Sequence, residues 1–213
     1  MEHRVAGVAM PQTELVDAAI VLVRRTLPDI AFNHSMRVYL FAALAAERLG
    51  IAFDAELLYV AALFHSLGLT EAHRQSKERF EVDGANAVRQ FLRQHGVDER
   101  RCETAWDAIA LHMTPGIPEH KASEIALLSA GVQMDLQGAA FRAFSSGQRD
   151  AVQKAFPRGT GFKQQMLELF ANGMRARPET TFGTFAADVL ERADPKYRRV
   201  NFCGAVLGAD WPE

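Results

Sequence analysis

The chain has 213 residues, of which 48% are hydrophobic and 23% charged, with a net charge of −2. This composition is ordinary for one globular domain with a substantial core, and the charge gives no basic field for nucleic acid or an acidic membrane. No apolar run approaches membrane-spanning length and no signal-peptide layout is present, so we expect a cytoplasmic protein. Cys102 and Cys203 lack metal-ligand spacing and are expected to be reduced thiols, although two cysteines could also pair.

Helical patterns begin after residues 1–11, which we expect to be a loose leader. Apolar residues in the segment 13–27 repeat with helical period, and Thr13 is placed to cap that helix. Asn33 is then expected to cap a second helix that runs to Gly50.

The third helix is expected to begin after Asp54 and to end near His65. It is apolar nearly all round, which is typical of a central, buried helix. Gly68 lets the chain turn away, and the polar stretch 69–80 is expected to be a loop near a pocket mouth.

The rest of the chain continues the helical pattern without a convincing alternating strand. We therefore predict one all-α domain of about nine helices. The irregular tail is expected either to pack back on the body or to contribute to a dimer contact. The later helices are predicted at about 84–96, 98–113, 122–136, 148–156, 162–175 and 182–192, and the tail at 197–213.

Three residues on separate predicted helices suggest a metal site. His34 lies early in the second helix, His65 at the end of the third, and Asp135 near the end of the helix at 122–136. Imidazole nitrogen and carboxylate oxygen are ligands that zinc and iron(II) accept, and three protein ligands leave a position for water or substrate. For any one histidine alone, a buried or surface residue satisfied by hydrogen bonds is the commoner explanation.

The order of these motifs resembles the HD-domain superfamily of metal-dependent phosphohydrolases over roughly residues 30 to 140. The segments that carry the resemblance are Asn33–Val38, Ala62–Gly68 and Asp135, and the segment Arg79–Ala85 is similar to the cyanamide-hydratase-like branch. The chain departs from the family at one position, because Ser66 stands where the family has a metal-binding aspartate.

The resemblance implies an HD-type helical fold with a divalent metal, zinc or iron first and manganese as an alternative. It implies that His34, His65 and Asp135 bind this metal, while Ser66 would hydrogen-bond the metal's water. Metal-bound water becomes a nucleophile near neutral pH. A serine hydroxyl carries no charge, so metal binding should be weaker than in the family.

Other residues are assigned to the same site, each with an alternative. His112 would orient substrate, move a proton or bind a second metal, or it would only face the negative end of its helix. Arg37 would face an anionic substrate or form a surface ion pair. Asp83 would cap the helix that follows it, or line the pocket together with Glu81 and Phe64 as substrate-binding residues.

The leading functional hypothesis is metal-dependent hydrolysis or hydration of a small molecule, such as a nitrile-like compound related to cyanamide. One alternative is a phosphohydrolase of a small phosphate ester or nucleotide. Another is a catalytically silent or engineered-inactive HD-fold binding protein, which Ser66 favours. The expected partner is a small-molecule substrate, with no nucleic acid and no membrane, and a homo-oligomer is left open.

Overall fold

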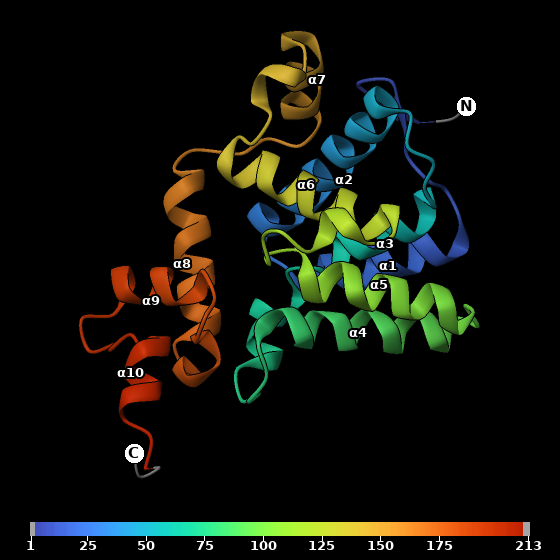
Figure 1. Cartoon of the computed structure of the whole chain (residues 1–213). Helices are drawn as coiled ribbons and strands as arrows, with labels where there is room; N and C mark the ends of the chain where they lie inside the picture. The colour runs from blue at the N-terminus through green and yellow to red at the C-terminus, as the bar shows by residue number, and fades with distance from the viewer. Residues whose placement is uncertain (1–2, 211–213) are drawn as a thin grey trace.

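The computed structural model describes residues 3–210, and 67% of these residues are helical. Figure 1 shows their arrangement. Within the described part there are ten α-helices, nine of them seven residues or longer, which confirms the predicted all-α class. They are α1 Glu14–Thr26, α2 Asp29–Leu49, α3 Ala55–Phe64, α4 Phe80–Gln94, α5 Glu99–Leu111, α6 Ser123–Gln137, α7 Ser146–Ala155, α8 Phe162–Met174, α9 Ala186–Ala193 and α10 Phe202–Leu207.

Short elements fill several connections. Five 3₁₀ helices are found in the described residues: η1 Leu67–Leu69, η2 Glu71–His73, η3 Pro118–His120, η4 Phe141–Ala143 and η5 Pro178–Thr181. In the whole described part of the chain, no helix is both long enough and apolar enough to cross a membrane.

The N-terminal segment is ordered against the body, contrary to the expectation of a loose leader. The strands β1 (Arg4–Val5) and β2 (Val8–Ala9) form an antiparallel hairpin. Val5 and Val8 are buried, and the Tyr39 hydroxyl donates to the Ala9 carbonyl at 2.9 Å. Strands of two residues are too short to show an alternating pattern, so they could not be predicted from the sequence. Residues 1 and 2 of the expected leader lie outside the described part.

Two predicted helix caps were wrong. The helix α2 begins at Asp29, after Pro28, rather than after Asn33, so His34 lies in its second turn. The helix α4 begins at Phe80, so Asp83 is inside its first turn and does not cap it. In both cases the helix begins without a side-chain cap, and the prediction chose a polar residue a few positions later because that residue type commonly caps helices.

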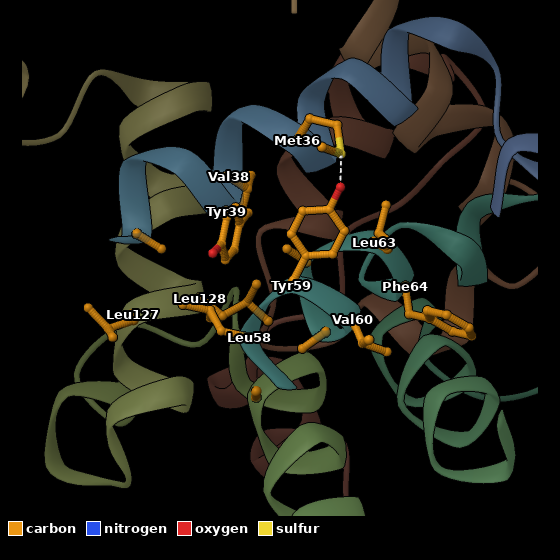
Figure 2. Close-up of a cluster of buried hydrophobic side chains, with 14 of the residues drawn as sticks. Met36, Val38, Tyr39, Leu58, Tyr59, Val60, Leu63, Phe64, Leu127 and Leu128 are labelled. Atoms are coloured by element: carbon orange, nitrogen blue, oxygen red, sulfur yellow. Dashed lines mark hydrogen bonds between the residues drawn. The ribbon is translucent and has the colours of Figure 1, made fainter. Parts of the chain in front are cut away.

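The core forms around α3, which is buried all round as predicted. Figure 2 shows its side chains packed against α2 and α6, with Tyr59 donating to the Met36 sulfur at 3.4 Å. The two helices that flank it, α2 and α6, cross closely. A Cβ atom on Gly131 of α6 would lie only 2.3 Å from the Val38 carbonyl oxygen of α2. This crossing brings the residues of the candidate site together.

The C-terminal third packs beside this body through a second apolar cluster that includes Phe80, Phe162 and Phe170 (Figure 1). Arg177 is fully buried and fastens the segment to α4 and η1. Its guanidinium bonds the Asp83 carboxylate and the carbonyls of Glu78 and Gly68.

The last predicted helix and the tail each differ in part from the prediction. The predicted helix at 182–192 begins later, at Ala186, because residues 182–185 form a turn. In the predicted irregular tail, the short helix α10 and the described residues around it are exposed. Residues 211–213 lie outside the described part. The dimer contact proposed for this tail stays a prediction.

Candidate functional site

The structure brings three histidines and one aspartate into a single buried cluster. His34 comes from α2, His65 and His112 follow the ends of α3 and α5, and Asp135 comes from the last turn of α6. The Nε2 atoms of His34 and His65 lie 3.2 Å apart, and His34 Nδ1 lies 2.7 Å from Asp135 Oδ2. The rings of His65 and His112 meet edge to face at 5.2 Å. All four side chains are buried.

Two of these histidines are held by their own helices. His65 Nδ1 donates to the Ala62 carbonyl at 2.7 Å, and His112 Nδ1 donates to the Ile109 carbonyl at 2.6 Å, in each case three residues back. Because a carbonyl only accepts, Nδ1 carries the proton and a neutral ring keeps a lone pair on Nε2. Burial lowers the pKa of His112, and burial together with the neighbouring His34 and His112 lowers that of His65 well below its usual value.

Asp135 is fully committed to partners inside the protein. Its Oδ1 accepts from Arg37 Nε at 2.8 Å, and its Oδ2 accepts from Arg37 Nη2 at 2.9 Å and from His34 Nδ1. Burial by itself would raise the pKa of Asp135, but the hydrogen bonds from His34 and Arg37 outweigh it and hold that pKa far below its ordinary range. Asp135 is therefore an ionised residue that orients His34.

Of the two roles predicted for Arg37, the surface ion pair was wrong. Arg37 is completely buried, so it forms no surface ion pair. Its remaining guanidinium nitrogen, Nη1, donates to the carbonyls of Phe156 and Pro157, each at 3.1 Å. Each guanidinium nitrogen has an internal acceptor, and these bonds use four of its five N–H groups. That Arg37 faces an anionic substrate stays a prediction.

Ser66 contacts the neighbouring ring of His65. Its hydroxyl donates to His65 Nε2 at 3.1 Å, which is the lone pair left by the bond to Ala62. Ser66 therefore adds a neutral group to the cluster, and its expected hydrogen bond to a metal's water stays a prediction.

The donor set does not fit the three-ligand metal centre expected of His34, His65 and Asp135. Among the residues that the structure describes, no group of three or more histidine, cysteine, aspartate or glutamate side chains is arranged to hold a metal ion. Two imidazole nitrogens converge, but the carboxylate oxygens of Asp135 point to Arg37 and His34, and Ser66 supplies no charge. Catalytic zinc and non-haem iron sites normally keep three protein ligands.

The three residues predicted to bind substrate are not members of the histidine and aspartate cluster. Glu81 is buried and accepts from Arg79 at 2.7 Å. Asp83 accepts from Ser76 at 2.8 Å and pairs with Arg177. Phe64 belongs to the apolar core of Figure 2, where its ring packs 5.0 Å from that of Phe91. Their substrate-binding roles stay predictions.

A cleft of about 600 Å³ reaches the cluster at His112. Next to it, an apolar groove of about 310 Å³ lies along α8 and α9 and shares Met113, Gln137 and Phe185 with the cleft. The cleft is lined by His112, Arg79, Gln133, Gln137 and Arg199 together with Met113, Thr114, Pro115, Gly183, Thr184, Phe185 and Asp188.

Phe162 and Arg158 are part of the site and were missed from the sequence. The Phe162 ring lies 6.4 Å from that of His34, and the guanidinium carbons of Arg37 and Arg158 lie 4.8 and 4.1 Å from its centre. Arg158 Nη1 also lies 3.8 Å from Asp135 Oδ1. From the sequence, Arg158 lay in a break between helices and Phe162 was only the start of the helix predicted at 162–175. Its packing over His34 depends on long-range contacts that no local pattern reports.

Comparison with known families agrees with this geometry. The HD domain profile matches residues 31–143, which is more than half of the chain and includes the whole histidine and aspartate cluster. The chain therefore belongs to the HD-domain family, whose members are generally metal-dependent phosphohydrolases. No curated protein matches the chain.

Proposed function

We propose that this HD-domain protein hydrolyses or hydrates a small molecule in the cleft walled by His112. Its membership in a family of hydrolases supports the proposal. The single observation that carries it is the position of His112, which belongs to the buried histidine cluster and also lines a cleft of about 600 Å³. Clefts of this size are typical of small-molecule sites.

His112 has the properties of a general base in this proposal. Its Nδ1 is tied to Ile109, and burial lowers its pKa, so the ring is neutral near pH 7 and Nε2 is free to take a proton from water. Ser129 donates to the His112 carbonyl at 3.0 Å and receives a bond from Gln133, a lining residue. In the family, a metal ion supplies an activated water. Because the donor set here does not complete such a centre, the proposal relies on groups of the chain itself.

The charges of the cleft favour a neutral, polar substrate. Arg79 is paired with Glu81, and Arg199 is paired with Asp188. A phosphate ester needs cations that are not already neutralised. We therefore favour a nitrile-like compound such as cyanamide, in line with the resemblance of the segment 79–85, and keep a small phosphate ester as the alternative. The two free cysteines support a cytoplasmic setting.

A catalytically silent binding protein is the second candidate. Ser66 in place of the motif aspartate favours it, as does the commitment of Asp135 to Arg37. In this case the cleft would hold a ligand without converting it.

The test is a substrate panel of cyanamide, small nitriles, nucleotides and p-nitrophenyl phosphate. Each is assayed with protein purified without chelators, after measurement of its metal content, and again after EDTA treatment. Turnover of one class should fall by about 100-fold or more in His112→Gln, because general bases contribute on that scale. The matched control is His120→Gln, since His120 is exposed and lines neither the cleft nor the groove. Saturable binding with no turnover would establish the second candidate instead.

A further inference from the structure

Arg37 and Asp135 form a buried ion pair in which each charge has a partner of opposite sign. Both side chains have no exposed surface, and two parallel hydrogen bonds of 2.8 and 2.9 Å join them. A guanidinium keeps its charge at every pH at which the protein is folded, and its planar fork matches a carboxylate. Asp135 therefore has a permanent positive partner supplied by the neighbouring helix.

Because residue 66 is a serine, the single positive charge of Arg37 is enough to balance the negative charge of the cluster. A site with a second carboxylate at position 66 would carry two negative charges and would call for a divalent ion. With serine there, Asp135 is the one carboxylate in contact with His34 and Arg37, and a single guanidinium balances it. Arg158 is the next cation, but its nitrogen is 3.8 Å from Asp135 and its side chain is partly exposed.

We propose that the Arg37 guanidinium is the built-in cation of this site and takes, toward Asp135, the part that a divalent metal takes in the family. It joins α2 to α6 through Asp135 and fixes the segment at Phe156 and Pro157 that leads to Phe162. The His34 ring is held through the same carboxylate. The cluster is consequently assembled without metal. This inference concerns how the cluster is held, and it stands whether or not the chain turns over a substrate.

The test replaces Arg37 and asks whether metal can take over its part. The melting temperature of the wild-type protein should not shift with EDTA, zinc chloride or manganese chloride. Arg37→Met leaves a buried carboxylate without its close partner, so its melting temperature should fall by roughly 6–20 °C. Zinc or manganese should then recover part of that loss.

The matched control is Arg177→Met, because Arg177 is the other fully buried arginine that is paired with an aspartate, here Asp83 of α4. It should be destabilised without recovery by metal. In the double variant Arg37→Met with Asp135→Asn, recovery should disappear because the carboxylate is gone. If Arg37→Met does not fold, Arg37→Gln serves the same purpose, since it removes the positive charge and keeps a hydrogen-bonding group.

Three results would overturn the proposal. The first is a wild-type protein that carries one equivalent of metal and loses stability with EDTA. The second is recovery of Arg37→Met by metal that is no greater than that of Arg177→Met. The third is undiminished recovery in the double variant, which would mean that His34 and His65 bind metal without Asp135.

Discussion

At the scale of single residues, the orientation of the site depends on short local bonds. His65 and His112 each follow the end of a helix, and the Nδ1–H group of each ring donates a hydrogen bond to a carbonyl three residues back. This hydrogen bond fixes the tautomer of each ring, so that Nε2 carries the lone pair and can accept a proton or a hydrogen bond. Ser66 then occupies the Nε2 lone pair of His65 with a hydroxyl. One position therefore decides whether the cluster holds an additional negative charge.

The first prediction concerns that position. Ser66→Asp would place a carboxylate beside His65 Nε2 and His34 Nε2, which lie 3.2 Å apart. We expect its zinc affinity to exceed that of the wild-type protein by about tenfold or more, because changes of ligands and their supporting partners at metal sites act on that scale. Titration of zinc against a chromogenic chelator, at one pH, measures the difference.

Ser66→Ala is the control for this prediction, since it removes the hydroxyl without adding charge and should leave zinc affinity at the wild-type level. Equal affinity in all three proteins would mean that residue 66 does not face the position of the metal. A gain of metal without any turnover in Ser66→Asp would favour the silent binding protein.

At the scale of elements, the site depends on how closely two helices approach. Gly131 lets α6 lie against α2, where His34 and Arg37 are found, and it stands one turn before Asp135. The absence of a side chain at this one position sets the separation of the two helices. That separation in turn allows the 2.7 Å bond between His34 and Asp135.

The second prediction follows from this crossing. In Gly131→Ala the new Cβ would lie 2.3 Å from the Val38 carbonyl oxygen, which is backbone and cannot rotate away. The helices must separate, and we expect the free energy of unfolding to fall by roughly 1–3 kcal/mol or more. Urea denaturation followed by circular dichroism measures this change.

Gly147 provides the control, because it is also helical and a Cβ there would meet nothing within 4 Å. Gly147→Ala should be neutral or stabilising by roughly 0.4–1 kcal/mol. If Gly131→Ala were as stable as the wild-type protein, close contact of α2 and α6 would not be what positions Asp135.

The elements themselves were largely predictable, because helical periodicity is a local signal. The central helix α3 was predicted with its cap, Asp54, and the structure confirms that cap. The starts of α2 and α4 were not, since Pro28 and Arg79 precede them without a side-chain cap. The convergence of His34, His65 and Asp135 was indicated by family order rather than by any pattern along the chain.

At the scale of the whole molecule, the C-terminal third closes the site, and the sequence carried no sign of this. Phe162 covers His34, and Arg177 anchors the segment to α4 through Asp83. A single chain gives the positions of these residues along the sequence but not the contacts between segments more than 90 residues apart. The surface ion pair predicted for Arg37 failed for the same reason, since its partner Asp135 is a distant, buried residue.

Complete burial of the cluster also has a consequence for the stability of the whole molecule. His65 and His112 are almost completely buried, so water can solvate a charge on either ring only poorly. Burial lowers the pKa of both below the value of about 6.5 that a histidine has in an unfolded chain. Below that pH the unfolded state binds more protons than the folded state. The contribution of these neutral rings is therefore present above about pH 6.5 and is lost as the pH falls below it.

The third prediction is that the free energy of unfolding decreases between pH 7.5 and 5.5, with a slope of up to about 1.4 kcal/mol per pH unit for each histidine. Asp135, whose pKa is held low, contributes stability that is lost only in more acidic solution. Urea denaturation at constant ionic strength measures the slope. His112→Gln should make the slope shallower, whereas His120→Gln, at an exposed position, should leave it unchanged. A free energy of unfolding that is flat across this range would mean that the cluster accepts protons in the folded state, and that the folded protein lets water or a counter-ion reach it.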